Sequence, residues 1–441
     1  MKKQKAPKTS LCIFEDAGYK KLEPITLLRA SFEVKCGILS LLDKILLEYG
    51  APATQSATEK KTGPKVILAC RGMLKETVQE RHPECKVIEF NGTTLPNTTA
   101  VATSLEAAAN ALAGACLFIN GRILAEPNLS KKIPLDGPDE TFVCNGTVVA
   151  ARLSTGKGLG ISPQKQSKQP ARKLPQIKTT KIDVKLIDYP WQLIKENSAQ
   201  IEADYKRINK KGAKKKAAIH KTVTFYKREN TIIGQGATIE AQVVIDARRG
   251  PVIIDAGAHI MPLTYIEGPA YIGENSTILG AQIRSGTSIG PSCKVHGEVT
   301  NSIIHGYSNK AHYGFLGHSY ICEWVNLGAG TTNSNLKNNY GNIKMWNDGQ
   351  LVDTKEQFMG CLIGDHTKTA IGTMINTGTV ISIFCNIFEG MPPKYVPPFS
   401  FGMKEKFEIE KALRMSAAAL QRRKKQLTNA EKQLIKLLLQ S

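Results

Sequence analysis

One central segment of the chain concentrates side chains that could take part in chemistry. Three of the eight histidines, His305, His312 and His318, lie close together within residues 296–359. A histidine near its ordinary pKa can accept a proton at neutral pH. Three histidines and a water molecule also form a catalytic zinc set. The histidines alone therefore leave two interpretations open, proton transfer and metal binding.

A Gly/Asn-rich run, NLGAGTTNSNLKNNYGN, follows in the same segment at Asn326–Asn342. Gly328-Ala329-Gly330 carries almost no side-chain bulk, so a ligand can approach the backbone amides closely. Side-chain amides further along the run offer hydrogen-bond donors and acceptors: Asn333, Asn335, Asn338 and Asn339. Such groups suit a polar ligand such as a sugar.

Both sides of this segment carry a six-residue repeat. Aliphatic residues recur six apart in several runs: Ile233, Ile239 and Ile245; then Ile260, Ile266, Ile272 and Ile278; and, after a five-residue step, Ile283, Ile289 and Val295. The period returns at Ile363, Thr369, Ile375, Ile381 and Ile387. A repeat of this length is typical of a parallel β-helix, in which each hexad supplies one short strand and three faces stack into a prism. The segment 296–359 interrupts a strong local rule, and function is expected where such a rule is broken.

The rest of the chain predicts other elements. Residues 11–154 alternate short apolar runs with helix-like stretches such as Gly37–Glu48, which indicates an α/β domain. Tyr189–Ile208 has helical spacing, and the leucines of residues 404–441 indicate an amphipathic helix or hairpin. The Pro-rich segment 392–402 is expected to leave the β-helix and wrap without pairing. We expect four parts: an α/β domain at 1–154, a basic linker with a connecting helix at 155–222, the β-helix at 223–392, and an exit and tail at 393–441.

The net charge of +21 is concentrated in three places. Residues 155–181, 206–221 and 404–441 carry the whole excess of lysine and arginine, so the remainder is close to neutral. This distribution makes nucleic acid an unlikely partner, because the charge lies in linkers and a tail. No apolar run reaches the roughly 18 residues of a membrane span. Ten scattered cysteines without a CxxC pair indicate reduced thiols in a cytoplasmic protein.

The segment Ser308–Lys344 resembles the acetyltransferase half of the bacterial bifunctional N-acetylglucosamine-1-phosphate uridylyltransferase/glucosamine-1-phosphate acetyltransferase. His312, Leu316-Gly317 and Asn326–Thr331 carry the resemblance. A divergent branch of bacterial sugar nucleotidyltransferases related to that enzyme is more similar still. Its pattern is matched by Leu11–Lys44, Phe118–Leu124, the YPWQLIKEN segment, Gly364–Ile381 and Pro392–Gly402.

The resemblance implies a left-handed β-helix, a homotrimer, and acetyl-CoA bound along the prism between neighbouring subunits. His312 would be the base, Gly328, Ala329 and Gly330 would bind acetyl-CoA, and the sugar phosphate would contact Arg284, Asn326, Asn335 and either Lys337 or Lys344. Phe315 stands where the family has an aromatic hydroxyl, and Thr300-Asn301 where it has a lysine. These departures leave the identity of the sugar open.

The same resemblance implies binding of UTP or another nucleoside triphosphate by the first domain. Asp16 would bind Mg²⁺, and Arg29 or Lys35 a phosphate. The loop EDAGYKK holds a single glycine where nucleotidyltransferases usually have a Gly-rich loop. A solvated charged loop is the competing interpretation of these residues.

The sequence therefore predicts a sugar-phosphate N-acetyltransferase fused to a sugar-1-phosphate nucleotidyltransferase and serving UDP-N-acetylglucosamine synthesis. One alternative is a nucleotidyltransferase alone, with the β-helix as a trimerisation or regulatory module. A zinc hydratase similar to γ-type carbonic anhydrase is another, although the histidine spacings of seven and six do not match that family's pair five apart. The third is a nucleic-acid-binding assembly protein.

Overall fold

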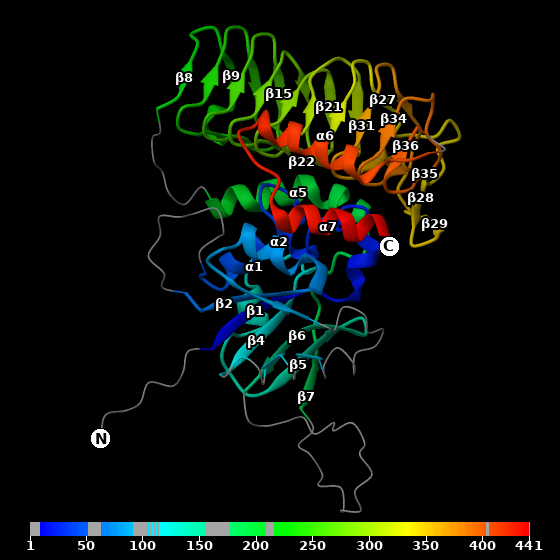
Figure 1. Cartoon of the computed structure of the whole chain (residues 1–441). Helices are drawn as coiled ribbons and strands as arrows, with labels where there is room; N and C mark the ends of the chain where they lie inside the picture. The colour runs from blue at the N-terminus through cyan, green and yellow to red at the C-terminus, as the bar shows by residue number, and fades with distance from the viewer. Residues whose placement is uncertain are drawn as a thin grey trace, which may run out of the picture. The chain divides into compact units, whose positions relative to one another are not determined.

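A computed structural model of the chain describes residues 9–51, 63–90, 104–105, 108–109, 112, 114–154, 177–208, 216–402 and 405–440. Much of the two basic linker runs lies outside these residues. The chain forms two compact units (Figure 1). The first comprises Met1–Lys20, Arg29–Val34 and Ser40–Asp188, and the second comprises Lys21–Leu28, Lys35–Leu39 and Tyr189–Ser441.

The first unit is built on a seven-stranded sheet of order β3-β2-β1-β4-β6-β5-β7. Its strands are β1 (Ser10–Phe14), β2 (Val66–Cys70), β3 (Lys86–Glu89), β4 (Cys116–Asn120), β5 (Glu140–Cys144), β6 (Thr147–Leu153) and β7 (Lys178–Lys181). β1 pairs in parallel with both β2 and β4, so the strand order reverses between β1 and β4. The strands β1 to β4 are short apolar runs of the kind expected within residues 11–154, which confirms the α/β prediction.

Short helices complete the first unit: η2 (Ser31–Glu33), α1 (Leu41–Glu48), η3 (Gly72–Leu74), α2 (Lys75–Arg81) and α4 (Leu129–Lys132), with η1 (Ala17–Leu22) crossing into the second. The sequence predicted a helix from Gly37, but α1 begins at Leu41. The reason is a cap, because the Asp43 amide donates to Ser40 Oγ at 3.0 Å and the Asp43 carboxylate accepts from Ser40. Such a capping box fixes a helix start.

The second unit contains the β-helix, whose three faces are parallel sheets. Face 1 contains β10 (Thr231–Ile233), β13 (Val252–Ile254), β16 (Ala270–Ile272), β19 (Thr287–Ile289), β22 (Ile303–Gly306), β25 (Tyr320–Glu323), β30 (Cys361–Ile363), β33 (Thr379–Ile381) and β35 (Tyr395–Val396). Face 2 contains β8 (Ala218–Ile219), β11 (Thr238–Ile239), β14 (His259–Ile260), β17 (Thr277–Ile278), β20 (Lys294–Val295), β23 (Asn309–Lys310), β26 (Asn326–Leu327), β31 (Lys368–Thr369), β34 (Asn386–Ile387) and β36 (Ser400–Phe401), with β37 (Glu405–Lys406) added antiparallel.

Face 3 contains β9 (Thr224–Tyr226), β12 (Val244–Asp246), β15 (Tyr265–Glu267), β18 (Gln282–Ile283), β21 (Glu298–Thr300) and β24 (Phe315–Gly317), and β27 (Thr332–Asn333) and β32 (Met374–Ile375) pair with each other beyond β24. Each coil passes through faces 1, 2 and 3 in turn. The repeating isoleucines form one continuous buried core along the prism. This confirms the β-helix and the inward direction of the hexad residues.

The coils continue further into the central segment than the sequence predicted. Regular strands run through β27, and only residues 334–359 leave the prism, where β28 (Lys344–Asn347) and β29 (Gln350–Asp353) form an antiparallel hairpin. The expectation for residues 392–402 was wrong in part. Their prolines lie between strands, so β35 pairs with β33 and β36 with β34, which adds another coil instead of an unpaired exit.

Helices pack within the second unit as the sequence predicted. α5 (Pro190–Ile208) buries Trp191, Ile194 and Ile201, and it contacts β16, β19 and β25 of face 1. After the β-helix, α6 (Ile409–Gln421) and α7 (Asn429–Gln440) contact each other as a helical hairpin. All ten cysteines are buried and unbridged. Among the described residues, no helix combines the length and apolar character that crossing a bilayer requires.

Candidate functional site

His312 lies between β23 and β24, at the corner where the chain turns from face 2 to face 3, and it is exposed. The residue two positions before it, Lys310, is instead only 4% exposed. Lys310 pairs with the core residue Val295 of the preceding coil, and its Nζ donates to the carbonyls of His296 at 2.8 Å and His312 at 3.1 Å. Burial lowers the pKa of Lys310 to about 8. A buried ammonium thus joins two successive corners beneath His312.

The Gly328-Ala329-Gly330 run forms the same corner one coil later. The Gly330 amide donates to the Tyr313 carbonyl at 3.1 Å, which fixes the two corners side by side. A Cβ at Gly328 would lie 2.5 Å from the backbone carbonyl carbon of Ala370, so the close stacking of the coils requires glycine there. The structure therefore brings His312 and all three acetyl-CoA candidates to one edge.

Asn326 reaches the same edge from face 2. It is exposed, it lies in register with Asn309 and Lys368 on the neighbouring coils, and Asn309 Nδ2 donates to its Oδ1 at 3.4 Å. Burial lowers the pKa of Lys368 to about 8, and its Nζ donates to the Trp324 carbonyl at 2.8 Å. Polar side chains on three successive coils thus lie before the Gly-Ala-Gly corner.

Asn335 lies at a different corner, between faces 3 and 1. Its Nδ2 is 2.8 Å from His318 Nδ1, and the His318 ring stacks on Phe358 with centroids 5.4 Å apart. Burial lowers the pKa of His318 to about 4, so this imidazole is neutral at physiological pH. Asn335 therefore orients a neutral histidine and does not meet His312 within the chain.

The three remaining sugar-phosphate candidates are also dispersed. Arg284 follows β18, two coils before β24, where it contacts Glu298 at 3.7 Å, Gln282 at 2.8 Å and the Tyr265 ring at 5.3 Å. Lys337 and Lys344 belong to the inserted residues 334–359, with Lys337 Nζ donating to the Asn342 carbonyl and Lys344 opposite Asp353 in the hairpin. Within one chain these cations do not converge on His312.

The three central histidines do not form a metal set. His305 lies in β22 on face 1 and its Nδ1 is 3.0 Å from Glu323 Oε1, whereas His312 and His318 lie at the two other corners described above. Over the described part of the chain, no group of three His, Cys, Asp or Glu side chains could hold a metal ion. The chain by itself therefore does not assemble the three-histidine zinc set.

In the first unit, Asp16 and two partners lie where the strand order reverses, beyond the carboxyl ends of β1 and β4. Open α/β sheets bind ligands at such a point. Asp16 Oδ1 accepts from Arg122 Nε at 2.6 Å and the Gly18 amide at 3.1 Å, and Oδ2 accepts from Arg122 Nη2 at 2.7 Å and Asn120 Nδ2 at 2.9 Å. Burial alone would raise the pKa of Asp16, but Arg122 and Asn120 hold it below the usual value. All the lone pairs of the carboxylate are engaged, so this arrangement does not fit Mg²⁺ binding by Asp16.

The other nucleotide candidates are placed separately. Arg29 is buried in the first unit and its carbonyl accepts from Arg71, whereas Lys35 belongs to the second unit. Arg71 also pairs with the buried Glu15 at 2.7 Å and lies over the Tyr19 ring at 4.0 Å. Burial raises the pKa of Glu15, against the opposing effect of Arg71.

Sequence reasoning missed Lys310, Arg71 and Arg122. The useful signal was position: Glu15 and Asp16 directly follow β1, Arg71 directly follows β2 and Arg122 comes two residues after β4.

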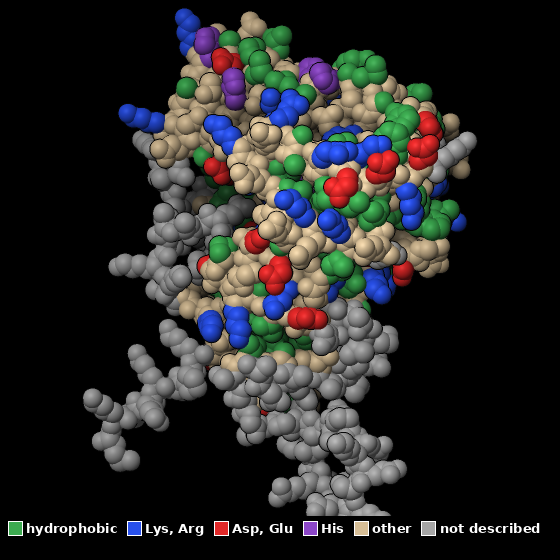
Figure 2. All heavy atoms as spheres, in the orientation of Figure 1, with side chains coloured by type: hydrophobic (Ala, Val, Ile, Leu, Met, Phe, Trp, Pro, Cys, Tyr) green, Lys and Arg blue, Asp and Glu red, His purple; other side chains and the backbone are tan. Residues whose placement is uncertain are grey.

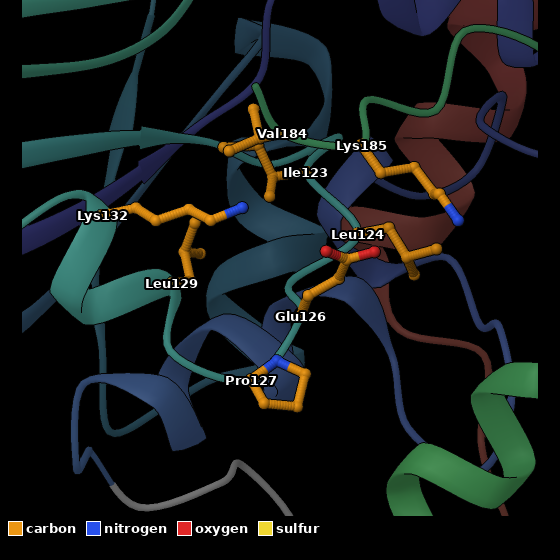
Figure 3. Close-up of a pocket in the computed structure, with 8 residues that line it drawn as sticks. All are labelled: Ile123, Leu124, Glu126, Pro127, Leu129, Lys132, Val184 and Lys185. Carbon is orange, nitrogen blue, oxygen red and sulfur yellow. The ribbon is translucent and has the colours of Figure 1, made fainter. Parts of the chain in front are cut away.

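A pocket lined by residues that follow β4 is very small (Figure 3). It holds about 10 Å³ between Ile123, Leu129, Lys132 and Val184, which is space for about one water molecule.

Comparison with known proteins supports two activities in the relatives. Residues 11–213 match the family model described as sugar nucleotidyl transferase. A bifunctional sugar-1-phosphate nucleotidylyltransferase/acetyltransferase of Sulfurisphaera tokodaii is 34% identical over 174 residues, which cover 37% of this chain and 41% of that protein. The bifunctional protein GlmU of Rippkaea orientalis is 30% identical over 135 residues, covering 26% of this chain and 30% of its own length.

The chain thus matches less than half the length of either relative. A solved UDP-N-acetylglucosamine acyltransferase of Francisella novicida covers 42% of this chain and 63% of its own at 17% identity, with a TM-score of 0.24 that is too low to bear on function. Residues 11–213 are thus similar to the sugar nucleotidyl transferase family, and the chain also shares similarity with bifunctional GlmU-type proteins.

Proposed function

We propose that the chain is a sugar-phosphate N-acetyltransferase that uses acetyl-CoA, joined to a sugar-nucleotidyltransferase unit. The observation that carries the first part is the corner between faces 2 and 3. There an exposed imidazole, His312, lies one coil from the Gly328–Gly330 backbone, with Asn326 on the adjoining strand.

The proposed reaction uses groups present at this corner. A neutral amine attacks the thioester carbonyl carbon, and His312 accepts the proton that the new C–N bond releases. The Gly328 amide donates to the Thr369 carbonyl and the Gly330 amide to the Tyr313 carbonyl, so both amides are already bonded to neighbouring coils. Among the described residues, the Ala329 amide donates to no backbone carbonyl. That N–H is therefore the donor available to the oxyanion. Coenzyme A leaves as the thiol when the C–S bond breaks and the sulfur takes the proton from His312.

The exposed apolar side chains around this edge support a homotrimer in which a neighbouring copy covers the site. Tyr313 is 69% exposed, Ile371 80% and Met374 56%, and all three belong to the corners or strands beside His312. Several large exposed apolar side chains along one edge are typical of a protein interface. A partner subunit would also be the source of phosphate-binding cations that this chain does not bring to His312.

For the first unit, the family match over residues 11–213 supports transfer of a nucleotidyl group to a sugar phosphate, with UTP or another nucleoside triphosphate as donor. The name of the Sulfurisphaera relative supports the combination of a sugar-1-phosphate nucleotidyltransferase and an acetyltransferase in one chain. We further propose that the two activities serve UDP-N-acetylglucosamine supply in the cytoplasm, as the resemblance of Ser308–Lys344 implies. Since Asp16 is saturated by Arg122 and Asn120, any Mg²⁺ must be held by other groups.

The test is acetyl-CoA-dependent acetylation of glucosamine-1-phosphate by the wild type, by His312→Ala and by the control His220→Ala. His220 is an exposed histidine beside the first coil. Loss of a general base lowers kcat by about 10²–10⁴-fold, so we expect that loss for His312→Ala and none for His220→Ala. Equal rates for all three proteins would remove His312 from the mechanism. Failure of the wild type to acetylate any aminosugar phosphate would exclude the acetyltransferase proposal.

A further inference from the structure

A cavity of about 340 Å³ lies between the β-helix and the end of α6. Its floor is face 2 and the adjoining corner, with Tyr307, Asn309, Trp324 and Asn326, and its wall is α6 with the residues that follow it. We call it the α6 cavity. Figure 2 shows several Lys and Arg side chains over the part of the molecule where α6 lies in Figure 1.

The lining of the α6 cavity is cationic. Lys368, Arg422 and Arg423 contribute three positive charges, and none of the described residues that line the cavity carries a carboxylate. None of the three cations forms an ion pair with a residue that the structure describes. A concave surface with three unneutralised cations favours an anion strongly.

Two of these cations are fixed in position. Arg423 Nη2 donates to Asn309 Oδ1 at 2.9 Å, and Lys368 Nζ donates to the Trp324 carbonyl at 2.8 Å and the His366 carbonyl at 3.3 Å. Arg422 is exposed and its guanidinium forms no such contact with another described residue, so it can turn toward a ligand. Fixed donors bind with less entropy cost than mobile ones.

The floor of the cavity is rigid because it is the start of an aromatic ladder. Tyr307 and Trp324 stack with centroids 4.6 Å apart, and His366, Phe384 and Phe399 continue the stack along successive coils. Each of the five has a positive φ at the corner between faces 1 and 2, which aligns the rings. Ser416 of α6 contacts His366 at 3.3 Å, so the wall is tied to the ladder.

We infer that the α6 cavity is a binding site for an organic phosphate of nucleotide size. The cations and the amide of Asn309 suit the phosphate, and the small apolar side chains of α6 suit the rest of the ligand. Small-molecule sites usually measure about 300–1,000 Å³, so the volume fits one nucleotide. The site stands on the chemistry of the cavity. Two ligands have this chemistry. The first is the nucleotide end of coenzyme A, and this identification rests on the proposed function. The second is a free nucleotide, which does not depend on the proposed function.

Trp324 supplies a direct measure of binding on the full-length protein. We expect adenosine 3′,5′-bisphosphate to change the tryptophan fluorescence with a saturable curve, and Trp324→Phe to remove that signal while Trp346→Phe retains it. Raising the salt concentration should weaken binding, because the contact is between charges. Uridine 5′-monophosphate, coenzyme A and inorganic phosphate are titrated in the same way.

Arg422→Gln and Arg423→Gln test the cations. Each should weaken nucleotide binding by roughly tenfold, as expected for one charge-assisted hydrogen bond. Arg414→Gln is the matched control, since it removes an exposed arginine of α6 that does not line the cavity. Circular dichroism confirms that the variants are folded.

Two further measurements identify the source. If coenzyme A competes with adenosine 3′,5′-bisphosphate and Arg422→Gln raises KM for acetyl-CoA at constant kcat, the ligand is the coenzyme. If nucleotides bind and that KM is unchanged, the ligand is a free nucleotide, and this result stands even where the acetyltransferase proposal fails. Absence of nucleotide binding, equal affinity for inorganic phosphate, or equal loss in Arg414→Gln would each overturn the inference.

Discussion

Replacing Lys310 by methionine tests whether a buried cation supports the His312 corner. Burial lowers the pKa of Lys310 from 10.5 to about 8, so the folded protein holds the proton less well than the unfolded chain. A shift of one pKa unit corresponds to about 1.4 kcal/mol. When Lys310 is protonated in both the folded and the unfolded state, its burial therefore lowers the free energy of unfolding by about 3 kcal/mol. This cost applies below about pH 8 and disappears as the pH rises toward 10.5.

The free energy of unfolding of the wild type should therefore increase with pH relative to Lys310→Met. Between about pH 7 and about pH 9, this increase should amount to about 1 kcal/mol of the burial cost of about 3 kcal/mol. Methionine removes the cost of burying the charge but leaves the carbonyls of His296 and His312 without the ammonium donor. A buried acceptor without a partner costs about 1–3 kcal/mol, so the two proteins should be similarly stable near pH 7.

Urea unfolding at several pH values and one protein concentration measures this difference. Lys294→Met is the matched control, because Lys294 is exposed on the preceding coil and lies in register with Asn309. The difference between wild type and Lys310→Met should change with pH, whereas that between wild type and Lys294→Met should not. A constant difference for Lys310→Met would refute the buried-charge reasoning.

Three further predictions concern other contacts. Burial lowers the pKa of His318 to about 4, so folding stability should fall by up to about 3 kcal/mol as the pH drops from about 6.5 to about 4, and urea unfolding of His318→Gln should show a smaller fall. Asp16→Asn leaves the buried Arg122 without the negative charge of its partner, so urea unfolding should show a free energy of unfolding lower by about 3–5 kcal/mol. An unchanged free energy of unfolding would contradict the importance of this ion pair. Ile371→Ser should weaken self-association in analytical ultracentrifugation, and a monomeric wild type would contradict the interface.

The fold was predictable because its determinants are local. An aliphatic residue every six positions dictates one buried side chain per short strand, and Ile239, Ile260 and Ile278 occupy the core as that rule requires. The meeting of His312 with Gly328–Gly330 was predictable for the same reason, since these residues lie about one coil apart in the chain.

Other parts of the candidate site depend on contacts that no local pattern encodes. Asp16 and Arg122 are 106 residues apart, and their pairing follows from the adjacency of β1 and β4. Asn335 follows β27 in sequence, yet its partner is His318 of the previous coil. Lys310 looks like a surface lysine beside Asn309, and only the register with Val295 shows that it points inward.

The corners of the β-helix explain why the chemistry gathers at some of them and structural contacts at others. Along the later coils, the corner between faces 1 and 2 is occupied by stacked rings such as Trp324 and His366. The corner between faces 2 and 3 carries Gly328 and Gly330 instead, which place no side chain over its backbone. The buried Lys310 Nζ donates to the His312 carbonyl, while the His312 side chain is exposed on the outside of the corner. A prism that repeats the same coil can thus carry the proposed acetyl transfer at one edge and hold α6 and its arginines at another.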